Sequence, residues 1–111
     1  MPRPTTRRVV VTGLGIISPV GIGLPESWSN IIAGKSGIGR ITRFDPSAYT
    51  SQIAGEVKGF DATQYIPAKE ARRFDTFIHY GLAAGIDAMK DAGLEPDRLN
   101  REMIGVCIGS D

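Results

Sequence analysis

The sequence predicts an α/β domain whose strands run parallel, and two patterns carry this prediction. Short apolar runs that end in glycine alternate with stretches in which apolar residues recur every three or four positions. The first pattern is typical of buried strands and the second of amphipathic helices. Their alternation along a chain is typical of a parallel sheet with helices packed on it. The length of 111 residues allows one domain with one modest core.

The first unit that the sequence predicts is a strand, a loop and a helix. Residues 8–13 read Arg-Val-Val-Val-Thr-Gly, a β-branched run that we expect to form a strand buried on both faces. Residues 13–23 hold four glycines and Pro19 and predict a loop. The helix begins near Pro25, a residue suited to a first turn. It ends at Gly34, where a left-handed backbone would stop it.

A long helix is the clearest element of the second half of the chain. Asp75 can cap its start with a side-chain carboxylate, and Gly93 with Pro96 just beyond predicts its end. One apolar stripe runs along it, formed by Phe74, Phe77, Ile78, Leu82, Ile86 and Met89. Gly81 and Gly85 beside this stripe predict that a neighbouring backbone packs closely there, so we expect a central helix.

Two further strands complete the expected order. Residues 53–57 predict a weak edge strand, and little else regular is expected between residues 35 and 67. Residues 104–109 alternate large and small apolar side chains, as a buried strand would. The expected order is therefore strand, helix, weak strand, long helix, strand.

Composition excludes several classes of function. A net charge of +1 gives no general case for binding nucleic acid, and no apolar run approaches the ~20 residues of a membrane span. A single cysteine, Cys107, excludes an intramolecular disulfide and any zinc site with several cysteines. We therefore expect a reducing cytoplasm, no metal and no cofactor.

Two glycine motifs resemble phosphate-binding loops but depart from them. Gly13-Leu-Gly-Ile-Ile-Ser18 has serine where a dinucleotide loop needs its third glycine, and Pro19 follows at once. Gly34-Lys35-Ser36 follows a predicted helix, whereas a P-loop lysine follows a strand. We expect the first to be a structural turn and the second to be a helix end.

Three other features are candidates for chemistry. Cys107 lies inside an apolar run and is expected to be a small buried hydrophobe rather than a nucleophile. His79 lies beside the apolar stripe with no metal ligand at a suitable spacing, which predicts a boundary histidine. Lys69, Arg72 and Arg73 share one helical face. These three cations are either a solvated surface or an anion-binding site.

Several stretches together resemble the start of a β-ketoacyl-[acyl-carrier-protein] synthase, in order and across nearly the whole chain. They are residues 8–15 (Arg-Val-Val-Val-Thr-Gly-Leu-Gly), 18–21 (Ser-Pro-Val-Gly), 33–38 (Ala-Gly-Lys-Ser-Gly-Ile), 43–45 (Arg-Phe-Asp), 69–75 (Lys-Glu-Ala-Arg-Arg-Phe-Asp), 80–81 (Tyr-Gly) and 91–94 (Asp-Ala-Gly-Leu). Residues 43–54 and the long helix resemble the type II elongating synthase more than type I.

This resemblance implies a fold and a reaction. The fold is thiolase-like, with two similar α/β halves in a five-layered αβαβα core, and residues 1–111 would be an incomplete first part of the first half. The family condenses an acyl group, held on a cysteine, with malonyl on the carrier protein, assisted by two histidines. Those catalytic residues would lie beyond Asp111, so we expect these 111 residues alone to be inactive.

The resemblance also implies partners. The intact enzyme would be a cytoplasmic homodimer in fatty acid biosynthesis. Lys69, Arg72 and Arg73 align with a basic cluster through which the family contacts its acidic carrier protein, which favours the anion-site interpretation. Two alternatives remain open: a carrier-binding module without chemistry, and a small nucleotide-binding α/β domain.

Overall fold

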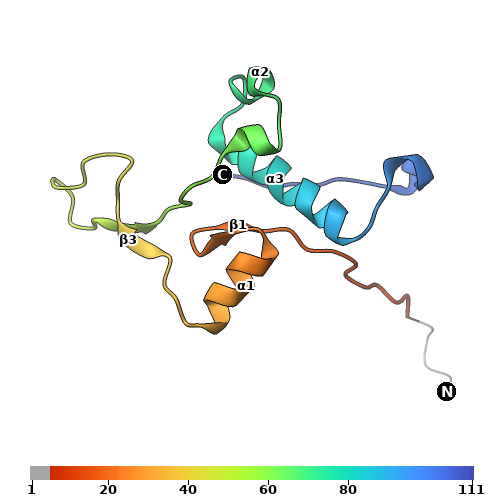
Figure 1. The fold of residues 1–111 in the computed structure, drawn as a ribbon, viewed down its shortest axis with the longest axis horizontal. Coiled ribbons are helices and arrows are strands. Elements are labelled where there is room, and N and C mark those ends of the chain that lie inside the picture. Colours follow the sequence, from red (N-terminus) through yellow and green to blue (C-terminus); the bar gives the residue numbers. More distant parts are fainter. Residues whose placement is uncertain (1–5) are drawn as a thin grey trace.

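The computed structural model describes residues 6–111, whose regular elements are short and widely spread (Figure 1). The described residues form three α-helices, α1 (Leu24–Ile32), α2 (Ala68–Ala71) and α3 (Thr76–Asp91). The strands are β1 (Ile17–Ser18), β2 (Gly21–Ile22), β3 (Ile38–Arg40) and β4 (Ile53–Gly55). Three 3₁₀ turns are η1 (Ala62–Gln64), η2 (Pro96–Arg98) and η3 (Arg101–Met103). None of these helices is long and apolar enough to cross a membrane.

Helices α1 and α3 form where the sequence predicts them. Pro25 lies in the first turn of α1, and Gly34 beyond its end has φ +70°. The Asp75 carboxylate accepts the Thr76 N–H at 2.9 Å at the start of α3. Gly93, at φ +68°, ends α3. There the N–H groups of residues 93 and 94 donate to the carbonyls of residues 90 and 89, which is a Schellman motif.

The sheets differ from the prediction, because the strands of the described residues pair antiparallel. β1 pairs with β2, and β3 with β4, each in a two-stranded hairpin. The predicted edge strand over residues 53–57 is confirmed as β4. Each hairpin joins strands that are close in sequence, so no helical crossover links them and the parallel arrangement does not arise.

The predicted strands at 8–13 and 104–109 are wrong for residues 6–111. Both segments lack strand pairing, and their apolar side chains face solvent, with Val9 91% and Val106 84% exposed. A strand forms only where a neighbouring strand satisfies its N–H and C=O groups. Within the described residues no segment pairs with either run. Cys107 is consequently exposed rather than buried.

The N-terminal segment packs tightly against α3. The β1–β2 hairpin lies between α1 and α3 (Figure 1). A Cβ atom on Gly15 would lie 2.0 Å from the Ala84 carbonyl oxygen, and one on Gly13 would lie 2.4 Å from that of Ala88. The close backbone approach that the sequence predicts for α3 therefore exists, but it is made by these two glycines. Gly85 has nothing near its Cβ position.

The core of the described residues is smaller than one modest domain core. Ala83 and Ile66 are its buried hydrophobic residues, 0% and 5% exposed. The radius of gyration is 18.3 Å, against about 13 Å for a compact chain of similar length. The extents of 62 × 44 × 26 Å describe an open arrangement in which helices and hairpins contact each other in pairs.

Candidate functional site

In the basic cluster of Lys69, Arg72 and Arg73, the two arginines follow the carboxyl end of α2, whereas Lys69 is its second residue. Lys69 is in the helix and Arg72 is its C-cap. The Arg72 N–H donates to the Ala68 carbonyl, and the Arg73 N–H donates to the Glu70 carbonyl at 2.9 Å. Cations at the end of a helix meet its exposed carbonyl groups, which makes this placement locally favourable.

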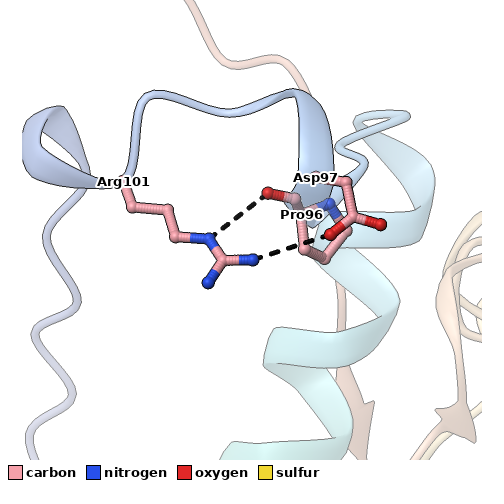
Figure 2. Close-up of polar contacts among 3 residues, drawn as sticks. All are labelled: Pro96, Asp97 and Arg101. Atoms are coloured by element: carbon pink, nitrogen blue, oxygen red, sulfur yellow. Dashed lines mark hydrogen bonds and ion pairs between the residues drawn. The ribbon is translucent and has the colours of Figure 1, made fainter.

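All three side chains of the basic cluster are exposed. Within residues 6–111 none of them takes part in an ion pair or a side-chain hydrogen bond. The ion pairs in that range lie elsewhere, between Arg98 and Glu95 and between Arg101 and Asp97. Figure 2 shows Arg101 between the Pro96 carbonyl and Asp97. The basic cluster therefore exposes three positive charges that make no ion pair within residues 6–111, with the Glu70 carboxylate between them in the sequence.

Two polar contacts attach the segment that carries the basic cluster to α3, and the Ile66 side chain just before α2 is buried. The Tyr65 hydroxyl donates to Asp87 Oδ2 at 3.0 Å, and His79 Nε2 lies 2.7 Å from the Ala71 carbonyl oxygen. Burial, together with the hydrogen bond and charge of Asp87, raises the pKa of Tyr65 above its usual range. The Tyr65 hydroxyl therefore remains a donor at neutral pH.

An aromatic group extends this attachment towards the β3–β4 hairpin. The Phe60 ring stacks on Tyr65, with centroids 5.9 Å apart, and meets Tyr80 edge-on at 5.1 Å. The Tyr80 hydroxyl accepts a hydrogen bond from the Arg43 guanidinium at 2.7 Å. Arg43 thus links the hairpin to α3.

Glu56 holds the end of the same hairpin. Its carboxylate accepts the Thr42 hydroxyl at 2.8 Å, the Thr42 N–H at 3.1 Å and the Arg43 N–H at 3.3 Å. The hydrogen bonds from Thr42, the hydroxyl above all, lower the pKa of Glu56 below its ordinary range. Glu56 and Arg43 border a groove of about 310 Å³.

A larger groove of about 580 Å³ lies beside α3 and is mostly apolar. It is bordered by Phe77, Ile78, Tyr80, Gly81, Leu82, Ile108, Gly109 and Ser110. Among these residues only the Tyr80 and Ser110 hydroxyls offer polar side-chain atoms. The groove contains no acid–base pair and no activated nucleophile, so its lining suits contact with apolar groups rather than chemistry.

The two glycine motifs are structural, as the sequence predicts. Gly13 and Gly15 face the backbone of α3, and the Leu14 N–H donates to Asp91 Oδ2 at 2.8 Å. The backbone at these two glycines and the Leu14 N–H are therefore occupied by contacts with α3. Gly34 and Lys35 close α1, because the Lys35 N–H donates to the Asn30 carbonyl at 3.0 Å.

The remaining sequence candidates are not assembled into a reactive centre. Cys107 is exposed in an irregular segment, whereas His79 is half-buried on α3 and bonded to a backbone carbonyl. No group of three or more metal-ligating side chains occurs in the stretch from residue 6 to residue 111. No local pattern in the sequence indicates the Tyr65–Asp87 and Glu56–Thr42 contacts, since each joins residues far apart in the chain.

Comparison with known proteins decides the family. The sequence model of the β-ketoacyl synthase N-terminal domain matches residues 6–111. The chain belongs to the β-ketoacyl synthase family. It is similar to "3-oxoacyl-[acyl-carrier-protein] synthase 2" of Vibrio cholerae, with 53% identity over 104 residues, and to the Synechocystis and Staphylococcus aureus (strain COL) proteins of that name, with 49% and 43% identity.

These relatives are much longer than the matched region. The matches cover 94% of this chain and 25% of each relative, so the chain spans about a quarter of their length. A solved structure, "The ishigamide ketosynthase/chain length factor", is similar to this chain, with a TM-score of 0.72 and 38% sequence identity. The match covers 84% of this chain and 23% of the chain in that structure. The predicted fold class, the first part of a thiolase-like α/β fold, is confirmed by this likeness.

Proposed function

We propose that these residues belong to a fatty-acid elongating enzyme that condenses an acyl group with malonyl-[acyl-carrier-protein]. The match to the three 3-oxoacyl-[acyl-carrier-protein] synthases carries the proposal. In this reaction a cysteine thiolate takes the acyl group and releases the carrier thiol. Malonyl then loses CO₂, and the resulting carbanion forms the new carbon–carbon bond as the bond to the cysteine sulfur breaks.

The catalytic groups of this reaction are proposed to come from outside these residues. One cysteine and one histidine are too few for a mechanism with one cysteine and two histidines. The part played by residues 6–111 is therefore scaffold and docking. We further propose that the working enzyme is a cytoplasmic homodimer and that it needs no cofactor.

A hybrid synthase tests this proposal. Residues 6–111 replace the matching quarter of the Vibrio cholerae synthase, and the hybrid is given acyl-carrier and malonyl-carrier substrates. We expect the hybrid to form 3-oxoacyl product and the 111-residue chain alone to form none. A soluble, cooperatively melting hybrid without product would contradict the proposal, as would product from the chain alone.

The proposed partner surface is the basic cluster, and the carrier protein is its proposed ligand. Exposed cations without internal partners attract an acidic protein over long range and increase its association rate. This observation also favours a second candidate function, a carrier-binding module that performs no chemistry. Elongation of malonyl-carrier substrate by the intact protein separates the two, because a binding module would bind the carrier protein without forming 3-oxoacyl product.

Charge reversal at Arg72 and Arg73 tests the partner surface. In the hybrid, Arg72→Glu with Arg73→Glu should weaken carrier binding at least tenfold at low salt, because attraction becomes repulsion. The affinity should also become less sensitive to salt. Fluorescence anisotropy with a dye-labelled carrier protein, repeated across a salt titration, measures both. Unchanged affinity across the titration would remove the basic cluster from the docking surface.

A further inference from the structure

His79 is the side chain of α3 that contacts the helix bearing the basic cluster most directly. Its Nε2 lies 2.7 Å from the Ala71 carbonyl oxygen. A carbonyl oxygen can only accept, so Nε2 carries the hydrogen and donates. The other donor to this oxygen within the described residues is the Phe74 N–H, at 3.4 Å. The histidine therefore makes the shorter of the two bonds at this carbonyl.

The carbonyl that His79 holds ends a helix that has little stability of its own. α2 has four residues and no side-chain N-cap, and a helix this short is not stable in isolation. The last carbonyls of a helix lack partners within it. Ala71 stands directly before Arg72 and Arg73, so a bond to its carbonyl fixes the backbone from which both guanidinium groups project.

α3 does not need His79 for its own termini. Its start is capped by Asp75 and its end by the turn at Gly93. The His79 side chain instead reaches eight residues back along the chain. The contact of His79 therefore holds α2 in its orientation and does not stabilise the ends of α3, the helix to which His79 belongs.

We propose that His79 is a positioning residue for carrier docking, which holds the basic cluster in its binding orientation through the Ala71 carbonyl. This inference rests on the proposed docking function of the basic cluster. Loss of the bond leaves all three charges in place but lets α2 move. Long-range attraction then survives, whereas the close contacts of the bound complex weaken.

The association and dissociation rates of the carrier protein separate these effects. Stopped-flow fluorescence with labelled carrier protein measures both rates on the hybrid synthase. His79→Leu should raise the dissociation rate about fivefold and leave the association rate unchanged. His79→Gln, whose amide can donate from a similar position, should restore the original rate. Arg72→Glu with Arg73→Glu is the charge control and should lower the association rate.

A general loss of structure gives a different pattern. If His79 only stabilised the fold, His79→Leu would also reduce condensation from malonyl on a small thiol, which bypasses docking. We expect that activity to stay unchanged while the KM for malonyl-carrier substrate rises. If the leucine variant fails to fold, His79→Asn replaces it in the test. The asparagine side chain is polar but too short to reach Ala71, so this variant should show the same raised dissociation rate.

Two results would overturn the inference, and they differ from failure of the docking proposal. An unchanged dissociation rate in His79→Leu, or in the folded His79→Asn, would show that the bond does not position the cluster. Equal rises in His79→Leu and His79→Gln would exclude the hydrogen bond as the cause. If the double charge reversal also left both rates unchanged, the basic cluster itself would not be the docking surface.

Discussion

At the scale of single residues, the glycines near α3 show how position decides what a missing side chain means. Gly15 lies against the helix backbone, where its absent Cβ would come within 2.0 Å of the Ala84 carbonyl oxygen. Gly85, on α3 itself, has open space at its Cβ position. The first glycine is required by packing, whereas the second only lowers the stability of its helix.

These surroundings predict opposite effects for the same substitution. Gly15→Ala should destabilise the packing of the N-terminal segment on α3 by about 1–3 kcal/mol, as overpacking does. Gly85→Ala should stabilise α3 by about 1 kcal/mol, because alanine is the better helix former. Urea unfolding of the hybrid synthase, followed by far-UV circular dichroism, measures both. A destabilising Gly85→Ala, or a neutral Gly15→Ala, would contradict the packing described here.

At the scale of elements, the two longer helices and the edge strand around Ile53 were predictable from the sequence, whereas the other strands were not. Helix signals are local: Pro25, Asp75 and Gly93 lie within or next to the turns that they start or end. A strand also depends on a partner strand. The run around Val10 has every local property of a strand but no partner strand to pair with. The basic cluster was found from spacing, but its attachment through His79 depends on a tertiary contact that spacing does not reveal.

The β3–β4 hairpin gives a prediction about pH. Glu56 has a pKa below its ordinary value of 4.5, so its contacts with Thr42 stabilise the folded hairpin above that pH. These contacts are lost as the pH falls through the pKa that Glu56 has in the folded hairpin, because the carboxylate then becomes protonated. In an NMR titration the Thr42 amide should shift with a midpoint below 4.5, and Glu56→Gln should abolish the shift.

The matched control for this titration is Asp45→Asn. The Asp45 carboxylate also has a lowered pKa, but hydrogen bonds from Ser47 cause it, so this variant should leave the Thr42 titration unchanged. A Thr42 midpoint at or above 4.5, or one that moves with Asp45, would show that Glu56 does not hold the hairpin.

At the scale of the whole molecule, the accessible surface is large for the mass of the chain and includes many large apolar side chains. The accessible surface is 9362 Å², whereas a compact monomer of 11.9 kDa would expose roughly 6000 Å². The excess includes the extended runs around Val9 and Val106. Both offer unpaired backbone groups beside apolar side chains, a combination that promotes pairing with other chains.

We therefore expect the 111-residue chain alone to self-associate at micromolar concentrations. Val9→Lys with Val11→Lys should reduce association by placing charges on the exposed run, without changing the helix content. Met103→Lys, at an equally exposed apolar residue outside both runs, is the control and should have little effect. Sedimentation velocity over a concentration series measures the outcome. A chain that stays monomeric throughout and melts cooperatively would show that these runs are covered in solution, contrary to the open arrangement described here.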